Sequence, residues 1–254
     1  MDNGEKIILE WKYNPIDFFE GPFLIENDDY KIEINNGNIK ATVSPEFYDS
    51  KKDARLDIHE EVNALFLGSQ TLNFEPFHLS KPSMSRLRPD GRKDVTIYPD
   101  PVECKVTANL DLTITDKYGN IIEDTRAERI AKKRRFAQLA ATYKKADSIV
   151  GSILNSYNNA VNDHSNEFIH LYEIIESLCG KFGNEKGLRD ALGISRNKIE
   201  RLRKLANTEP LTQGRHRGKS PGQLRDATNA EKNQARDIAQ QLIHRYLEYI
   251  DTNS

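Results

Sequence analysis

Cysteine is almost missing from this sequence, since Cys104 and Cys179 are the two examples in 254 residues. Two distant thiols cannot build a disulfide framework, and no histidine cluster at ligand spacing accompanies them to form a zinc site. Long apolar runs are missing too, and none approaches the roughly 20 residues that a membrane-spanning helix needs. The acidic start, residues 1–5, lacks the basic and apolar parts of a signal peptide. We therefore expect a cytoplasmic protein with no membrane association, no cofactor and no bound metal.

Acidic and basic residues are unevenly divided along the chain. Residues 1–124 hold 14 Lys and Arg against 24 Asp and Glu, a net charge of −10. Residues 125–254 hold 23 against 15, a net charge of +8, and most of this excess lies in residues 181–250, with 15 against 8. Such a division is typical of a nucleic-acid-binding part beside a part that does not bind it. The alternative is that the halves attract each other or partner subunits.

Short alternating segments separated by turn residues characterise the first half. Residues 30–34 and 39–43 alternate on either side of Asn35–Asn38, which tolerate positive φ, and this pattern predicts a hairpin. Residues 54–67 fit a strand face or a helix face equally well. We predict an antiparallel β-sandwich or barrel-like domain over residues 1–124. The other strand-like segments are 6–13, 95–98 and 105–115.

From Thr125 onward, the apolar residues recur at the spacing of an amphipathic helix. Thr125 and Glu128 match a capping box, and apolar residues then recur at helical spacing to Val161, with Gly151 as a site for a kink. Such a helix of about 37 residues would be about 55 Å long and could pack in its own bundle or dimerise with a copy of itself. Further helices are predicted after Ser165, at 185–192, at 195–206 and after the capping box Thr228–Glu231, with a loop at 207–224. The prediction is an α+β protein with a β-rich domain over 1–124 and an all-α bundle over 125–254.

Residues 187–202 resemble the helix-turn-helix of DNA-binding regulators. Gly193 would make the turn, Ser195 would cap the second helix, and the inner face would carry Leu188, Leu192, Ile194, Ile199 and Leu202. Arg189 stands where the first helix of that family has a small residue. The resemblance implies that nucleic acid is contacted by the outer face of the second helix, which holds Arg196, Asn197, Lys198, Arg201, Arg203 and Lys204. The alternative is a pair of short helices in a larger bundle with a solvated basic face.

A basic glycine-containing segment, residues 213–219, is a second candidate for phosphate contact. Its glycines allow close backbone approach, and Arg215, Arg217 and Lys219 suit phosphate, with His216 able to titrate near neutrality. The alternative is a mobile basic loop.

The helical half, with a long first helix and helices that carry Arg, Asp and His, resembles HEPN domains. Many members of that family are metal-independent ribonucleases of bacterial defence and toxin systems. The resemblance implies that Arg236 would hold a phosphate and His244 would move a proton, with His216 as an alternative base. Seven residues separate Arg236 from His244, where the family has four to six between its Arg and its His. The alternative is an exposed Arg and a His at the edge of a packed helix.

Two short segments in the β half match nuclease or protease motifs only in part. Residues 99–105 contain Asp100, Glu103 and Lys105, but these lie too close together for the separate strands of a PD-(D/E)xK nuclease. His59–Glu61 lacks the second His of a zinc protease.

We rank a nucleic-acid-binding protein first, with the β half docking a protein partner or ligand, in a bacterial and defence-related setting. The arrangement also resembles uncharacterised bacterial two-part proteins with a HEPN-like helical half that occur near defence genes. A non-catalytic scaffold or subunit of a homo-oligomer comes second, and a HEPN-type ribonuclease third. The positions of His216, His244, Arg236 and Arg215 would separate the last two hypotheses.

Overall fold

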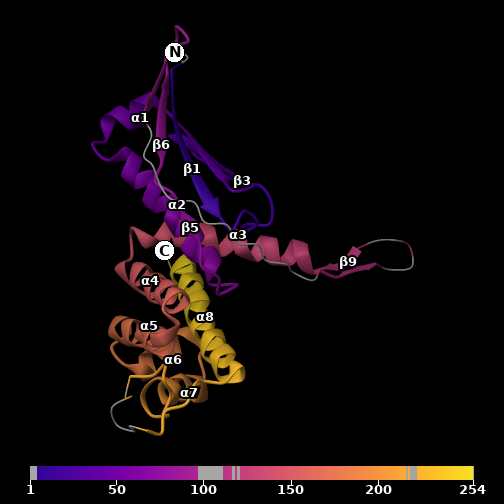
Figure 1. Ribbon diagram of the computed structural model, residues 1–254, viewed down its shortest axis with the longest axis vertical. Coiled ribbons are helices and arrows are strands. Elements are labelled where there is room, and N and C mark those ends of the chain that lie inside the picture. The colour runs from indigo at the N-terminus through magenta and orange to yellow at the C-terminus, as the bar shows by residue number, and fades with distance from the viewer. Residues whose placement is uncertain are drawn as a thin grey trace. The chain divides into compact units, whose positions relative to one another are not determined.

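A computed structural model describes residues 5–96, 111–115, 118, 121–215, 217 and 222–253 (Figure 1). The chain divides into two compact units. Residues 1–63 and 77–135 form the first, and residues 64–76 and 136–254 form the second. Two helices, α2 (Ala54–Gln70) and α3 (Thr125–Lys144), therefore contribute residues to both. The division into two separately folding domains between residues 124 and 125 stays a prediction.

The first unit contains a seven-stranded antiparallel sheet in the order β2-β3-β4-β1-β6-β7, with β5 paired to one end of β1. Alternation along β1 buries Ile7, Leu9, Trp11 and Tyr13, while Glu10 and Lys12 remain exposed. One face of the sheet therefore forms the core of this unit. The strands are β1 (Lys6–Asn14), β2 (Phe23–Glu26), β3 (Tyr30–Asn35), β4 (Asn38–Val43), β5 (His78–Leu79), β6 (Ser83–Leu87) and β7 (Lys93–Thr96).

The predicted hairpin at residues 30–43 is confirmed as β3 and β4. Asn36 and Gly37 make the turn with φ of 45° and 75°, the left-handed values that a two-residue hairpin turn requires. The ambiguous segment at 54–67 is helical and lies in α2, because Ile58, Val62 and their helical neighbours are buried together. A short helix, α1 (Pro45–Ser50), precedes it, capped by the Ser44 hydroxyl.

The α+β class is confirmed, but the sheet of the described residues is open and does not close into a barrel. The strand predicted at 95–98 coincides in part with β7, and its residues 97 and 98 lie outside the described residues. Residues 101–110 and the string 99–105 lie outside them as well. A separate two-stranded sheet comes next along the chain and is made of β8 (Thr113–Thr115) and β9 (Ile121–Asp124).

Helix α3 begins at Thr125 directly after β9, but the capping box predicted there is wrong. The Thr125 hydroxyl accepts a hydrogen bond from the backbone amide of Leu112. The first turn of the helix is capped instead by the Asp124 carboxylate, which accepts a hydrogen bond from the backbone amide of Ala127. In the first half of the helix, Lys133 is buried and donates to the Glu20 carboxylate at 2.7 Å. Burial alone would raise the pKa of Glu20, but hydrogen bonds from Arg129 and Lys133 hold it below its ordinary value.

The single long helix predicted from Thr125 to Val161 is wrong. Helix α3 ends at Lys144, and α4 (Ser148–Asn162) begins after Asp147, whose carboxylate caps it by accepting from the Ile149 amide at 2.8 Å. Gly151 lies inside α4, and the break falls before this helix, at residues 145–147. The break also removes the excess length that a kink or a partner would have had to accommodate.

The remaining helices of the second unit pack around α5 and α8. Helix α5 contacts α4, α6, α7 and α8, and α8 also contacts α4, α6 and α7. The predicted capping box Thr228–Glu231 is confirmed, whereas Ser165 lies within a 3₁₀ turn and Asn166 occupies the N-cap position of α5. The helices are α5 (Glu167–Lys181), α6 (Glu185–Leu192), α7 (Arg196–Asn207) and α8 (Asn229–Thr252).

Candidate nucleic-acid interface

Helices α6 and α7 form the two-helix unit that the sequence predicts at residues 187–202. Gly193 ends α6 in the left-handed conformation with φ of 61°, and α7 begins three residues later. The five residues predicted to face inward are all buried: Leu188, Leu192, Ile194, Ile199 and Leu202.

Two local details differ from the expected helix-turn-helix pattern. Ser195 holds the N-cap position of α7, but its side chain makes no capping hydrogen bond. Arg245 of α8 donates to the carbonyl oxygens of Leu192 and Gly193 at 2.8 and 2.7 Å, which ties the turn to the last helix. The turn is thus fixed by a guanidinium from outside the motif.

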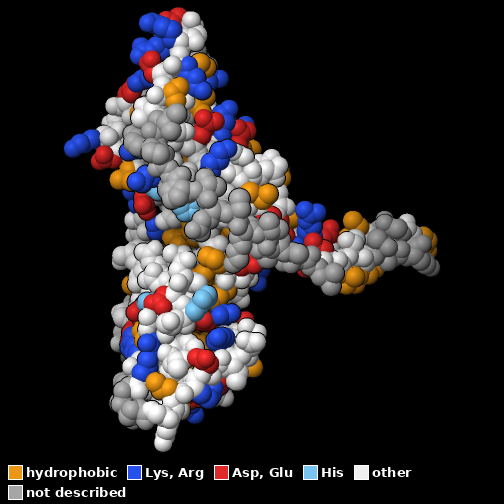
Figure 2. All heavy atoms as spheres, viewed as in Figure 1, with side chains coloured by type: hydrophobic (Ala, Val, Ile, Leu, Met, Phe, Trp, Pro, Cys, Tyr) orange, Lys and Arg blue, Asp and Glu red, His pale blue; other side chains and the backbone are white. Residues whose placement is uncertain are grey.

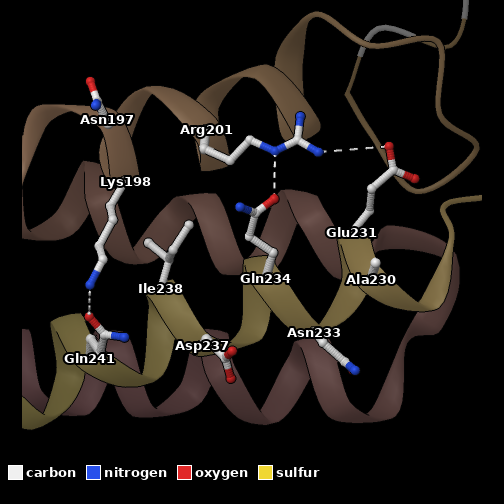
Figure 3. A pocket seen from close by; sticks show the side chains of 10 residues that line it. All are labelled: Asn197, Lys198, Arg201, Ala230, Glu231, Asn233, Gln234, Asp237, Ile238 and Gln241. Atoms are coloured by element: carbon white, nitrogen blue, oxygen red, sulfur yellow. Dashed lines mark hydrogen bonds and ion pairs between the residues drawn. The ribbon is translucent and has the colours of Figure 1, made fainter.

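A groove of about 580 Å³ lies between α7 and α8 (Figure 3). From α7 it is lined by three residues of the predicted interface, Asn197, Lys198 and Arg201. From α8 it is lined by amide and acidic side chains and by two apolar residues: Ala230, Glu231, Asn233, Gln234, Asp237, Ile238 and Gln241. The groove is therefore rich in groups that both donate and accept hydrogen bonds.

Glutamine side chains of α8 hold the two cations of the groove in place. The Arg201 guanidinium donates through Nε to the Gln234 amide oxygen at 2.7 Å, and Lys198 donates to the Gln241 amide oxygen (Figure 3). An amide oxygen positions a cation without cancelling its charge. The fixed geometry lowers the cost of ordering these long side chains when a ligand binds.

An acidic network surrounds one end of the groove and neutralises Arg201. Its guanidinium pairs with Glu209 and lies 3.8 Å from Glu231, and Arg225 pairs with both of these carboxylates. The hydrogen bond from Arg225 is the largest reason that the pKa of Glu231 lies well below its ordinary value. Arg201 is therefore a positioned donor more than a source of positive charge.

The outer face of α7 retains positive charge. Asn197, Arg201 and Lys204 follow one another at intervals of four and three residues and so share a face. Lys204 is exposed and has no hydrogen bond or ion pair from its side chain to another described residue. Arg196 is exposed as well and pairs within its own helix with Glu200 at 2.7 Å.

The structure does not bring the other predicted cations to this groove. Arg203 pairs with Glu185, and Arg215 makes two hydrogen bonds of 2.7 Å with Glu176. Arg217 donates to the Ser165 carbonyl oxygen at 2.6 Å, beside the start of α5. The hydrogen bonds that Arg203 donates to Tyr172 and Glu185 raise its pKa, and those that Arg215 donates to Glu176 raise the pKa of Arg215. Lys219 and His216 lie outside the described residues.

The two candidate ribonuclease residues that the structure describes are each held by other side chains. Arg236 makes a bidentate pair with Glu167 at 2.7 and 2.8 Å and covers the Phe74 ring at 4.0 Å. His244 is only 8% exposed. Its Nε2 lies 2.8 Å from the Thr71 hydroxyl, and its ring stacks on Phe136 at 3.6 Å. This geometry does not favour phosphate binding or proton transfer, and the ribonuclease hypothesis stays a prediction.

The amide side chains of α8 are the part of the groove that sequence reasoning missed. Asn, Gln and Asp residues in a long amphipathic helix look like ordinary solvated positions. One signal was nonetheless present, because Asn233, Asp237 and Gln241 recur every four residues and therefore lie on one face of α8. Only the placement of α8 beside α7 turns that face into part of a groove.

Comparisons of the chain with protein-family models, with curated proteins and with solved structures found no match. The resemblances to helix-turn-helix proteins and to HEPN domains therefore remain resemblances. Among the helices of the described residues, none has the length and apolar character needed to cross a membrane.

Proposed function

We propose that this protein binds nucleic acid through the outer face of α7 and the adjoining groove with α8. The observation that carries the proposal is the groove itself, where Asn197, Lys198 and Arg201 stand beside the amide groups of Gln234 and Gln241. Arg, Lys, Asn and Gln are the side chains that pair with base edges. Hydrogen bonds across the groove hold both cations in position before any ligand arrives.

Double-stranded DNA fits this surface better than double-stranded RNA. A projecting helix can enter the wide major groove of B-form DNA, whereas the major groove of A-form RNA is too narrow for side chains to read. The α6–α7 pair supports this choice, since its turn, its buried residues and its exposed second helix follow the helix-turn-helix pattern. A setting in bacterial defence belongs to the proposal only as far as the sequence resemblance implies it.

The ion pairs around the groove set how strongly binding depends on salt. Lys198 and Lys204 pair with no carboxylate among the described residues, and Arg196 makes an exposed pair within its own helix that a phosphate can replace. Arg201 and Arg203, by contrast, are paired with carboxylates of other elements. About three neutralised phosphates give a slope of about −3 in a plot of log K against log salt concentration. Contact by all eight cations of the predicted interface would give about −7.

Fluorescence anisotropy with labelled duplex DNA, duplex RNA and single-stranded DNA tests the proposal. We expect binding at about 50 mM salt, tighter for duplex DNA, with a slope near about −3. Replacing Arg196, Lys198 and Lys204 with Ala should abolish most of it. The matched control replaces Lys40, Lys52 and Lys93, three exposed lysines of the first unit, and should leave binding unchanged. Equal loss in both triple variants, or no binding by the parent protein, would contradict the proposal.

A further inference from the structure

The cations of the α7–α8 groove fix the orientation of the Gln234 and Gln241 amide groups. Lys and Arg side chains carry hydrogen-bond donors and no acceptor, so their partners are the amide oxygens. The Gln234 oxygen accepts from Arg201 Nε at 2.7 Å. The Gln241 oxygen accepts from Lys198 in the same way (Figure 3). The end of each amide that remains available to a ligand is therefore its NH2 group.

These NH2 groups present hydrogen-bond donors to the groove. Neither amide nitrogen donates to another described residue, and Gln234 is exposed whereas Gln241 is half-buried. Lys198 keeps further N–H donors as well, because an ammonium group carries three and Gln241 accepts one. The side of the groove around Gln241 therefore presents donors, while the amide oxygen already faces a cation.

An acceptor lies beside these donors on the same helix. Asp237 is exposed, and it precedes Gln241 by four residues and so shares its face of α8. Its carboxylate makes no hydrogen bond or ion pair with another described residue. Figure 3 shows it between Gln234 and Gln241 along α8. A carboxylate at this point repels a phosphate, so a base edge is the part of DNA that suits it.

The combination of donors and one acceptor matches the major-groove edge of a G·C base pair. Guanine presents two acceptors there, N7 and O6, and its cytosine presents the N4 amino group as a donor. The Gln241 NH2 group suits the guanine, and the Asp237 carboxylate suits the cytosine. Adenine fits less well, because a glutamine reads adenine through both its NH2 group and its amide oxygen. In Gln241 that oxygen is held by Lys198.

We propose that the α7–α8 groove prefers guanine-containing duplex DNA, a preference that rests on the nucleic-acid binding proposed above for the same surface. Gln241 reads the base through its NH2 group. Lys198 is a positioning residue, because it fixes the Gln241 amide in the orientation that favours guanine.

Fluorescence anisotropy of the full chain with three labelled duplexes of equal length tests the preference. One contains G·C pairs, one A·T pairs and one inosine·cytosine pairs. Inosine keeps N7 and O6 but lacks the N2 amino group that guanine carries in the minor groove. We expect the parent protein to bind the G·C and inosine·cytosine duplexes equally, and about tenfold more tightly than the A·T duplex.

The outcomes separate this preference from nucleic-acid binding as such. Equal binding of all three duplexes would overturn the guanine preference and leave the proposed function standing, whereas binding of none would overturn both. An inosine·cytosine duplex that binds like the A·T duplex would show that the minor groove or the shape of the DNA is read instead, and it would also overturn the preference.

Lys198→Met tests how the preference arises. Without the cation, the Gln241 amide can present its oxygen as well, so adenine becomes an equal partner. We expect the ratio of G·C to A·T affinity to fall from about tenfold to about one. Lys204→Met is the matched control, since Lys204 is an exposed lysine of the same helix and has no amide partner among the described residues.

The control should weaken binding of both duplexes and keep their ratio, because it removes charge and leaves the Gln241 amide in place. A ratio that stays unchanged in Lys198→Met, or that falls equally in both variants, would overturn the positioning role of Lys198.

Discussion

At the scale of single residues, the pair between Arg236 and Glu167 has the clearest energetic consequence. Glu167 is fully buried, and Arg236 supplies a hydrogen bond to each of its carboxylate oxygens. Arg236→Ala leaves a buried carboxylate without its cation, which costs about 3–5 kcal/mol. Urea unfolding should measure this loss. The double variant Arg236→Met with Glu167→Leu should recover most of it, and a loss below about 1 kcal/mol in the single variant would mean that the pair behaves as a surface ion pair.

The sequence alone suggested a catalytic role for Arg236 and His244, whereas the structure gives each of them a structural partner. Arg236 and His244 stand out in the sequence because Arg and His are typical of ribonuclease sites. Their actual partners, Glu167 and Thr71, lie 69 and 173 residues away along the chain. No local pattern links positions so distant. Only the packing of α8 against the rest of its unit makes the partners visible.

At the scale of helices, we expect substitution of glycine by alanine to have opposite effects on stability at Gly68 and at Gly151. A Cβ at Gly68 would lie 2.4 Å from the Phe136 carbonyl oxygen, because α2 and α3 approach closely there. A Cβ at Gly151 in α4 would have no neighbour closer than 3.9 Å. Gly68→Ala should destabilise by about 1–3 kcal/mol or more, and Gly151→Ala should stabilise by about 0.5–1 kcal/mol. Thermal unfolding of both variants measures this, and a shift of the same sign in both would contradict the packing described.

Helix boundaries were predictable where a local signal sets them. Thr228 and Glu231 form their capping box within four residues, and Gly193 ends α6 because glycine has no Cβ to clash in a left-handed turn. The break at residues 145–147 could not be predicted in this way. Tyr143 and Val150 are seven residues apart, about two helical turns, so the apolar face keeps its phase across the break.

At the scale of the whole molecule, the charge division in the sequence is a poor guide to free positive charge. The second half has a net charge of +8, yet many of its arginines are paired with carboxylates in the structure. Figure 2 accordingly shows basic and acidic side chains interspersed on the visible face of the helices. Sequence composition correctly pointed to residues 181–250 as the site of the basic excess, but it could not show which cations remain available.

Acid should destabilise the protein through carboxylates of the second unit. Burial alone would raise the pKa of Asp147, but hydrogen bonds from Tyr246 and the Ile149 amide lower it, and Arg225 lowers the pKa of Glu231. A group with a lowered folded pKa stabilises above its unfolded pKa and loses that effect as pH falls toward the folded value. The melting temperature should therefore hold from about pH 7 to about pH 5 and fall below about pH 4.

Circular dichroism melts across this range measure the effect. The double variant Asp147→Asn with Glu231→Gln should show a shallower fall in melting temperature than the parent protein. An unchanged slope would mean that other carboxylates control the acid response.

The most direct test of nucleic-acid binding at the α7–α8 groove is hydrogen–deuterium exchange of the full chain with and without duplex DNA. Binding there predicts slower exchange in residues 193–204 and 229–241, since these segments line or flank the groove. The same protection should vanish in the variant that lacks Arg196, Lys198 and Lys204. Protection confined to the β-sheet unit, or no protection in either groove segment despite measurable binding, would contradict the central claim.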